Sequence, residues 1–319
     1  MSTSGDQFRI IAPMRRLVLG ALLLFGALSI SVSALRQPAT AQPPARNIEV
    51  EKLRDNLYLM RGGGGNSGVF ITSAGVVVVD TKNPGWGQPL IEKIKTVTDK
   101  PVTMLINTHT HYDHNSGNVE FPATVQVVTH SNTKEHMRVM LAPTGVSPDA
   151  PANIFKDNDW RGMPTRTFTR RMTIGRGADR ITLHYFGRGH TDGDAFVVFP
   201  AIGVMHAGDI FSGKNIPLLD AINGGSGLRI GSTLRQAAGI KGVTSIITGH
   251  STVMTPKDLR EYADFNDEFS AAVVAGKKAG LSVDEIAKSW TIPAKYAGYA
   301  APNAARLRNN VQIVFDEAK

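Results

Sequence analysis

Three histidines and an aspartate fall within six consecutive residues of this sequence, from His109 to His114. They follow the apolar run 102–106, which is typical of a buried strand. In an extended backbone, residues i and i+2 project to the same side, roughly 6–7 Å apart at Cα, so His109 and His111 can converge on one metal ion. Asp113 and His114 come where the chain should turn into a helix, and they suit a second metal beside the first. The cluster therefore predicts a metal site at the end of a strand.

The absence of cysteine narrows the chemistry of such a site. The chain has 319 residues, of which 42% are hydrophobic and 19% are charged, so it holds ample material for a folded core. Without cysteine there can be no disulfide, thiolate-bound zinc, thiol nucleophile or lipid anchor on cysteine, and any zinc must be held by histidine and carboxylate. The formal charge of +8 is spread along the chain, and it does not argue for nucleic-acid binding.

Residues 1–41 are interpreted as a signal peptide. A pair of arginines precedes the apolar run 17–30, and the sequence Ala-Thr-Ala that closes this segment fits a small-x-small cleavage pattern. The apolar run is shorter than the about 20 residues that a membrane span needs. We expect cleavage, a linker at 42–47 and a periplasmic or secreted protein with no stable membrane insertion; an uncleaved N-terminal anchor is the alternative. The paired arginines match a twin-arginine signal only loosely.

Residues 48–254 alternate between strand patterns and helix patterns, as a mixed α/β domain does. The stretch 62–68 contains a formal G-x-G-x-x-G, but a strand pattern follows it instead of a helix. We therefore interpret it as a hairpin turn or a loop beside the metal site and reject a dinucleotide site. Asp80 closes the apolar run 76–79 and is either a cap or a partner that orients a metal-bound histidine. The helical pattern that follows predicts a C-terminal extension over 255–319.

Three further strand patterns each end near a residue type that binds metals. His190 lies among glycines after one strand pattern, Asp209 follows another, and His250 comes directly after a third. Glycines at such a position let a ligand approach a metal from a tight turn. None of the three is distinctive alone, but their recurrence at strand ends predicts that they join the cluster.

The residues that contact a substrate are harder to predict than the metal ligands. Pocket walls are expected from the glycine-rich loop and from loops such as 142–161 and 211–230. Lys214 and Arg188 are weak candidates for binding a substrate carboxylate, with a surface role as the alternative. His130 and His136 have no partner at ligand spacing, so we interpret them as structural.

Taken together, H-x-H-x-D-H at 109–114 followed by His190, Asp209 and His250 resembles the ligand set of the metallo-β-lactamase superfamily. The resemblance implies an α/β fold, a four-layer αββα sandwich with the metals at one edge. It implies one zinc at His109, His111 and His190, a second at Asp113, His114 and His250, and Asp209 bridging both. A bridging aspartate is similar to the glyoxalase II and lactonase branches. β-Lactamases with a cysteine in the second site would need a thiol that this chain lacks.

The resemblance implies a hydrolase. Two neighbouring dications lower the pKa of a bound water from about 15.7 towards about 7, and the hydroxide attacks a carbonyl; Asp113 would orient this nucleophile as the catalytic residue. We predict an exported dinuclear zinc hydrolase acting on a small ester, lactone, thioester or β-lactam, with iron or manganese as possible substitutes for zinc. Two alternatives stay open, an iron-dependent redox protein that resembles sulfur dioxygenases and a non-catalytic metal-binding protein. The sequence predicts neither the particular substrate nor the oligomeric state.

Overall fold

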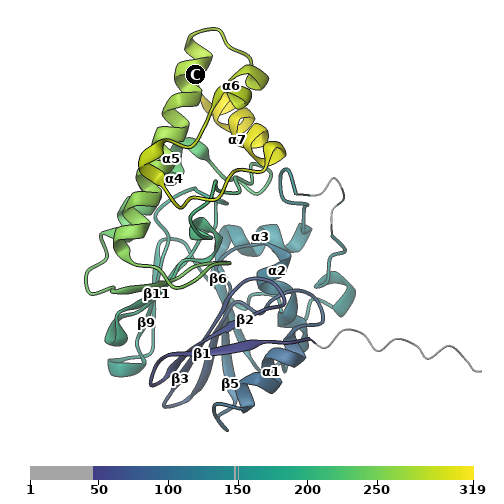
Figure 1. The fold of residues 1–319 in the computed structure, drawn as a ribbon. Coiled ribbons are helices and arrows are strands. Elements are labelled where there is room, and N and C mark those ends of the chain that lie inside the picture. The colour runs from purple at the N-terminus through teal and green to yellow at the C-terminus, as the bar shows by residue number, and fades with distance from the viewer. Residues whose placement is uncertain (1–45, 147–148, 150) are drawn as a thin grey trace, which may run out of the picture. The chain divides into compact units, whose positions relative to one another are not determined.

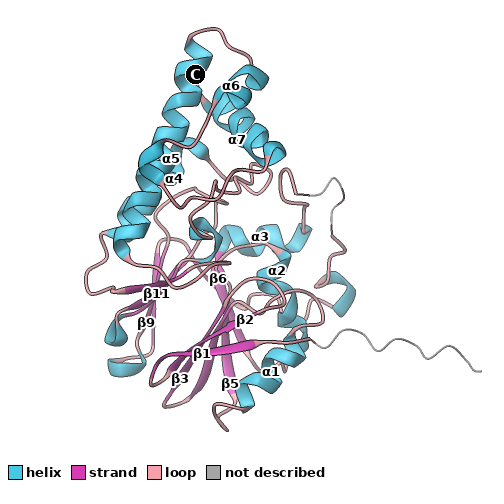
Figure 2. Ribbon diagram, in the orientation of Figure 1, coloured by secondary structure: helices cyan, strands magenta, loops and turns pink. Residues whose placement is uncertain are grey.

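Two β-sheets form the centre of the fold, as Figure 2 shows in magenta. The structure is a computed structural model that describes residues 46–146, 149 and 151–319. The expected signal peptide at 1–41 and most of the linker lie outside these residues, so both stay predictions. The described residues belong to one compact unit, Ala45–Lys319.

The first sheet has seven strands that lie side by side in the order of the sequence. They are β1 (Glu49–Arg54), β2 (Leu57–Arg61), β3 (Ser67–Thr72), β4 (Gly75–Val79), β5 (Val102–Ile106), β6 (Gln126–His130) and β7 (Arg166–Phe168). The strands from β1 to β4 are antiparallel, and those from β4 to β7 are parallel. The parallel half therefore ends at one edge of the sheet, where the H-x-H-x-D-H motif follows β5.

The second sheet has five strands in the order β12-β11-β10-β9-β8. They are β8 (Arg171–Ile174), β9 (Ile181–His184), β10 (Phe196–Phe199), β11 (Val204–His206) and β12 (Ser245–Ile247). β11 and β12 are parallel, with Val204 beside Ser245 and His206 beside Ile247. Their carboxyl ends consequently deliver Asp209 and His250 to the same edge.

Alternating apolar residues explain why the two sheets pack face to face. In β4, Val77 and Val79 belong to the core between the sheets, whereas Val76 and Val78 pack on the outer side with helix α1 (Gly87–Lys95). Strand β10 alternates in the same way between the inner core and the outer helices. Successive side chains of a strand point to opposite faces, so each sheet is covered on both sides. The predicted αββα sandwich is confirmed.

Helices cover the outer faces of both sheets (Figure 1). Besides α1 they are α2 (Tyr112–Asn115), α3 (Ser131–Val139), α4 (Gly227–Ala238), α5 (Pro256–Lys278), α6 (Val283–Ser289) and α7 (Ala304–Glu317). The last three form the expected helical extension, and with α4 they share one apolar core against the outer side of the second sheet. The domain boundary at 254 stays a prediction, because the extension and the sheets share this core.

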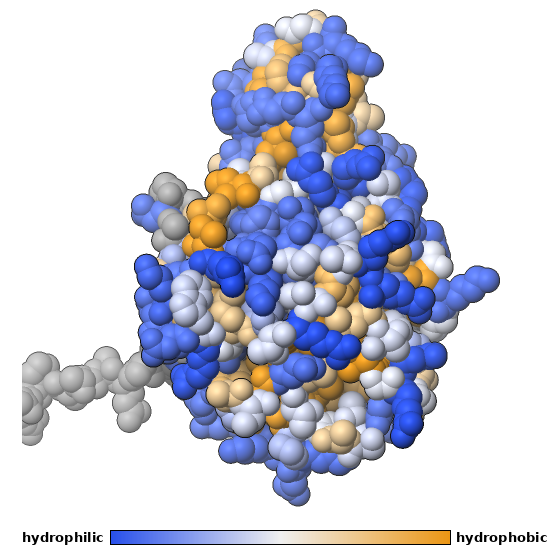
Figure 3. Space-filling model, turned by 180° about the vertical axis from the view of Figure 1, so that it is seen from behind, coloured by the Kyte–Doolittle hydropathy of each residue, from blue (hydrophilic) through white to orange (hydrophobic). Residues whose placement is uncertain are grey.

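Helix α4 was not predicted: its first residues lie in the stretch 211–230 that the sequence indicated as a loop. The short strand β1 was also not predicted. Among the described residues, no helix combines the length and apolarity needed to cross a bilayer. The face drawn in Figure 3 is mainly hydrophilic, with smaller apolar areas between charged side chains.

Candidate metal centre

The predicted metal ligands lie at the carboxyl ends of strands from both sheets. The motif that contains His109 and His111 follows β5, and its last members start helix α2. His190 lies between β9 and β10, Asp209 follows β11, and His250 follows β12. The structure brings all seven predicted side chains together in two adjoining groups of possible ligand atoms.

The first group contains His109, His111, His190 and Asp209, whose ligand atoms all lie within 4.8 Å of one another. The Nε2 atom of His190 is 3.1 Å from Nδ1 of His111. The Nε2 atom of His109 is buried and has no hydrogen-bond partner. Buried polar atoms are nearly always partnered, so an unpartnered nitrogen beside three other ligand atoms fits a cation site.

The second group contains Asp113, His114 and His250. The Nε2 atoms of the two histidines are 3.2 Å apart, and Nε2 of His250 is also 3.2 Å from Oδ2 of Asp113. Asp209 reaches this group as well, because its Oδ1 lies 3.2 Å from His114 Nε2 and its Oδ2 lies 3.2 Å from His250 Nε2. Asp209 is therefore within reach of both groups.

These separations fit metal ligation. With zinc–nitrogen bonds of about 2.0–2.1 Å, two nitrogens of a tetrahedral site lie about 3.3–3.4 Å apart. The nitrogen pairs in the two groups are separated by 3.1 and 3.2 Å. Two facing ring nitrogens cannot both donate a proton to each other, whereas both can bind one cation. The donor set of histidine and aspartate thus fits divalent metal ions.

The other ring nitrogen of three buried histidines is held by a protein oxygen. The pairs are His111 Nε2 with Asp220 Oδ2 at 2.7 Å, His114 Nδ1 with Asp80 Oδ2 at 2.8 Å, and His190 Nδ1 with the Leu218 carbonyl at 2.6 Å. Such a partner keeps a proton on the outward nitrogen and leaves the inward nitrogen free to ligate. The ring orientations are therefore set by the protein itself.

Asp80 has the bonds of an orienting partner. Its Oδ1 accepts a hydrogen bond from the Thr108 amide at 2.8 Å, and its Oδ2 accepts from the Thr108 hydroxyl at 2.7 Å as well as from His114. Asp80 also lies close enough to His109 and His114 to count as a possible ligand of a third group. Because donors already occupy both of its oxygens, the geometry favours the orienting role over direct ligation.

Asp220 is a fully buried carboxylate that no sequence pattern indicated. Its Oδ2 accepts from His111 and from Asn223 Nδ2 at 2.6 Å, and its Oδ1 accepts from the amide and the hydroxyl of Thr144 at 3.0 and 2.9 Å. It therefore links His111 to two loops at once. Asp220 and His111 are 109 positions apart in the chain, so neither spacing nor local pattern could reveal the pair.

Burial and nearby carboxylates shift the histidine pKa values in opposite directions. Burial lowers the pKa of His190 to about 4 and that of His109 well below its usual value, so both rings are neutral and able to ligate. Burial also acts to lower the pKa of His250, but the adjacent aspartates outweigh it and raise the value to about 9. The same competition raises the pKa of His114. The carboxylates thus favour positive charge at this place, and a divalent cation would supply it.

The glycine-rich loop lies against the second group, as one of its two interpretations expected. The Gly65 amide donates to the Asp113 carbonyl at 2.9 Å, and a Cβ at Gly65 would lie 2.1 Å from Cε1 of His114. The buried Lys82 ammonium donates to the carbonyls of Met60 and Gly65, each at 2.9 Å, and so fixes the loop. Only a glycine allows this close approach to the histidine ring.

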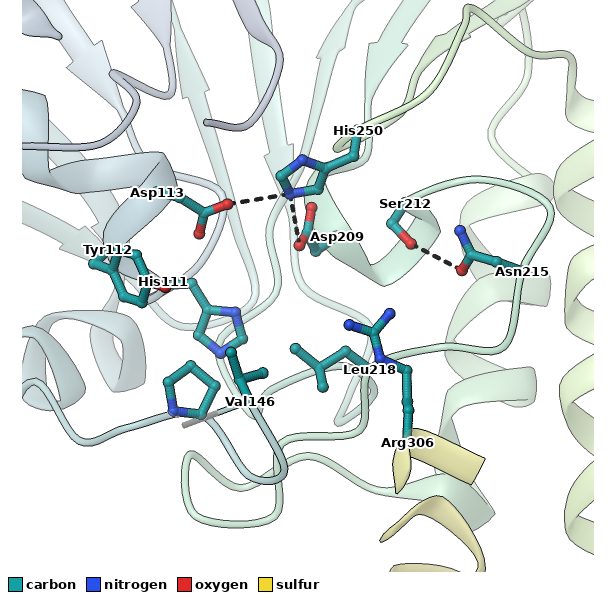
Figure 4. Close-up of a pocket in the computed structure, with 11 residues that line it drawn as sticks. His111, Tyr112, Asp113, Val146, Asp209, Ser212, Asn215, Leu218, His250 and Arg306 are labelled. Carbon is teal, nitrogen blue, oxygen red and sulfur yellow. Dashed lines mark hydrogen bonds and ion pairs between the residues drawn. The ribbon is translucent and has the colours of Figure 1, made fainter. Parts of the chain in front are cut away.

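A cavity of about 300 Å³ opens onto both groups (Figure 4). His111, Asp113, Asp209 and His250 contribute to its lining, and Arg306 contributes from helix α7.

Neither weak candidate for substrate binding belongs to this lining. Lys214 pairs with Asp258 and Glu261 at 3.0 and 3.1 Å, and Arg188 donates to the carbonyls of Gly224 and Gly225 at 2.5 and 2.9 Å. The structure thus favours the surface role for both and identifies Arg306, which was not predicted, as the basic side chain at the cavity.

The two histidines interpreted as structural have protein partners. His136 Nε2 is 2.8 Å from Asp192 Oδ1, and His130 Nε2 is 2.9 Å from the Thr169 carbonyl. Neither belongs to a group of possible ligand atoms among the described residues.

Comparison with known proteins decides the family. The sequence matches the profile of the metallo-beta-lactamase superfamily over residues 60–261, which is more than half of the chain. The chain belongs to the metallo-β-lactamase superfamily. The resemblance seen in the motif is thereby confirmed, and the profile spans all seven predicted ligands while ending before helices α6 and α7.

Known members of the superfamily match different parts of the chain. It is 31% identical over 178 residues to the metallo-beta-lactamase type 2 of Elizabethkingia meningoseptica, covering 51% of this chain and 62% of the relative. The chain therefore spans less than two thirds of that relative. It also resembles the metallo-beta-lactamase from Pontibacter korlensis, with a TM-score of 0.56, 19% identity and coverage of 69% of this chain and 99% of the other. The chain also resembles the stereoselective inverting sec-alkylsulfatase Pisa1 from Pseudomonas sp., with a TM-score of 0.64 and 14% identity. This match covers 85% of this chain and 50% of the sulfatase chain. Both structural likenesses show a shared fold alone.

Proposed function

We propose that this protein is an exported dinuclear zinc hydrolase. The observation that carries the proposal is the position of Asp209, whose two oxygens face the histidines of the second group while its ligand atoms also belong to the first. A carboxylate shared between two ligand groups suits two neighbouring cations. Export rests on the expected signal at 1–41.

The residues of the centre have separable roles in hydrolysis. When bound, divalent cations acidify water and polarise the scissile group. Asp113, whose side chain is 23% exposed and lines the cavity, is placed to orient the attacking water, while its Oδ2 lies beside the histidine nitrogens of the second group. Asp80, Asp220 and the Leu218 carbonyl hold the ring protons of three histidines on their outward nitrogens. The binding geometry is consequently built before any substrate arrives.

Zinc is the metal that we propose, because imidazole and carboxylate are its usual donors when cysteine is absent. The same donors accept iron and manganese. The metal therefore has to be identified by measurement, and an iron form would open the redox alternative.

The proposed substrate class is a small molecule with an ester, lactone, thioester or β-lactam bond. The relative named as a metallo-β-lactamase supports β-lactams as one member of this class. Alkyl sulfates are added to the test panel, because the sec-alkylsulfatase shares this fold over 85% of the chain.

Metal reconstitution tests the proposal. The protein is stripped with a chelator and reloaded with zinc, iron(II) or manganese, and bound metal is counted. Turnover is then measured on a panel of aryl esters, lactones, thioesters, β-lactams and alkyl sulfates, with oxygen consumption followed in parallel. His190→Ala is compared with His136→Ala, because His136 belongs to neither ligand group.

The expected result is two zinc ions per chain, hydrolysis that zinc restores, loss of turnover in His190→Ala and retention in His136→Ala. Restoration by iron alone, with oxygen consumed, would replace the hydrolase with the redox alternative. Stoichiometric metal without turnover across the whole panel would favour a non-catalytic metal-binding protein.

A further inference from the structure

Helix α7 supplies a basic side chain to the cavity above the metal ligands. Arg306 lines the cavity together with His111, Asp209 and His250. In Figure 4 its guanidinium reaches from α7 toward the part of the cavity bounded by Ser212. The superfamily profile ends at residue 261, so this side chain belongs to the part of the chain that the family pattern does not describe.

The backbone that carries Arg306 is firmly held. The Asn303 side chain caps α7 by accepting from the Ala305 and Arg306 amides at 3.0 and 3.1 Å. One turn after Arg306, Asn310 donates to the Pro217 carbonyl at 2.7 Å, so the helix is tied to the loop that also lines the cavity. Arg306 is thus positioned by a capped helix with a buried apolar face.

Within the part of the chain that the structure describes, the Arg306 guanidinium has no counterion. It forms no ion pair and donates no side-chain hydrogen bond to any residue that the structure describes, although Arg308, two positions on, pairs with Asp284 at 2.6 Å. Arg306 is half-buried, so part of its hydration is already lost. A partly buried cation without a partner at the wall of a cavity is available to an anionic group of a ligand.

The rest of the wall limits what that ligand can be. Pro143, Val146 and Leu218 contribute apolar surface, while the metal ligands lie elsewhere in the same cavity. Asn215 adds an amide to the same lining, and its Oδ1 accepts a hydrogen bond from the Ser212 hydroxyl at 3.3 Å. The cavity therefore combines a reaction centre, an apolar wall and a separate cation.

From this arrangement we propose that Arg306 is a specificity-determining residue that binds a carboxylate of the substrate away from the scissile bond. The inference rests on the proposed hydrolase function and adds a substrate class to it, namely small esters or related acyl compounds that also carry an acid group. A guanidinium binds a planar carboxylate through two parallel hydrogen bonds, which fixes the orientation of the ligand as well as its charge.

Two esters with acyl chains of the same carbon number test the proposal, 4-nitrophenyl hexanoate and the mono-4-nitrophenyl ester of adipic acid, which replaces the terminal methyl with a carboxylate. The zinc-loaded protein is compared with Arg306→Gln, with Arg306→Lys and with the control Arg308→Gln on the same helix. We expect Arg306→Gln to lower kcat/KM for the acid ester by about ten- to a hundredfold, mainly through KM, because a hydrogen bond to a charged group is lost. The neutral ester should change by less than about twofold, and lysine should restore part of the loss.

Equal loss on both esters, or no loss on the acid ester, would overturn the role of Arg306. A binding measurement separates this role from the hydrolase proposal. Adipamate and hexanamide are titrated calorimetrically into the same variants, and only the affinity for adipamate should fall in Arg306→Gln. If the unchanged protein hydrolyses neither ester, these esters leave the proposed substrate class, while the adipamate titration still decides whether Arg306 binds a carboxylate.

Discussion

Replacing Asp220 with asparagine probes how the protein sets the ring orientation of a metal ligand. The substitution keeps the shape of the side chain, but one of its oxygens becomes a donor. Oδ2 faces two donors, His111 Nε2 at 2.7 Å and Asn223 Nδ2 at 2.6 Å, and Oδ1 faces the amide of Thr144 at 3.0 Å. In either orientation the new amino group therefore points at a donor that it cannot bond.

The size of the effect follows from which donor is left unpaired. If the amino group faces His111, the ring must move its proton to Nδ1, the nitrogen that faces His190. Loss of such a partner typically lowers metal affinity by about 10–100-fold, or about 1.4–2.7 kcal/mol. In the other orientation the buried Thr144 amide loses its acceptor, which costs about 1–3 kcal/mol of stability.

Metal affinity is measured by titrating metal-free protein with zinc against a chromophoric chelator, and stability by urea unfolding of the same preparation. Asp192→Asn is the matched control, because Asp192 Oδ1 bonds His136 Nε2 at 2.8 Å and this histidine belongs to neither ligand group. We expect Asp220→Asn to weaken one of two zinc sites at least tenfold or to lose stability by the amount given above. Wild-type values for both quantities, or an equal loss in Asp192→Asn, would refute the reasoning.

Two further substitutions test the loop beside the metal centre. Gly65→Ala should displace the His114 ring, since the new Cβ would lie 2.1 Å from Cε1, and we expect turnover to fall by about tenfold or more. The control is Gly239→Ala, whose nearest contact would be 3.3 Å and which should leave turnover unchanged. Burial lowers the pKa of Lys82 from 10.5 to about 7. Between these two pH values the unfolded chain binds a proton at Lys82 that the folded protein does not bind, so the free energy of unfolding should rise with pH. Urea unfolding measures the free energy of unfolding at pH 7 and pH 9. Its increase between the two should be larger by about 2 kcal/mol in the unchanged protein than in Lys82→Met. The same pH dependence in both proteins would contradict this prediction.

The clustering of the candidate metal ligands could be predicted because it depends on a local motif and on where strands end. His109 and His111 project to one side of an extended segment, and the other ligands follow strands whose apolar pattern is easily recognised. Parallel neighbours then bring strand ends to one edge, as β11 and β12 do for Asp209 and His250. A short motif and a rule of sheet topology were therefore enough to bring seven side chains together.

Helix α4 could not be predicted because tertiary packing overrides its local preference. Glycines at 227 and 231 lower helix propensity, and the sequence around them reads as a loop. In the fold, a Cβ at Gly231 would lie 1.8 Å from Oδ1 of Asp267 on α5, and one at Gly227 would lie 2.3 Å from Val314 on α7. The glycines permit close approach of these helices, a requirement that only the folded structure reveals.

The partners of the centre depend on still longer connections. Asn310 on α7 binds the Pro217 carbonyl and accepts from the Leu219 amide, and the carbonyl of Leu218 between them holds His190 Nδ1. The same helix carries Arg306 to the cavity. The two Asn310 contacts join residues 93 and 91 positions apart, and no periodicity or motif indicates them. Because α7 both holds the loop behind one candidate ligand and lines the cavity, the helical extension belongs to the site as much as the strands do.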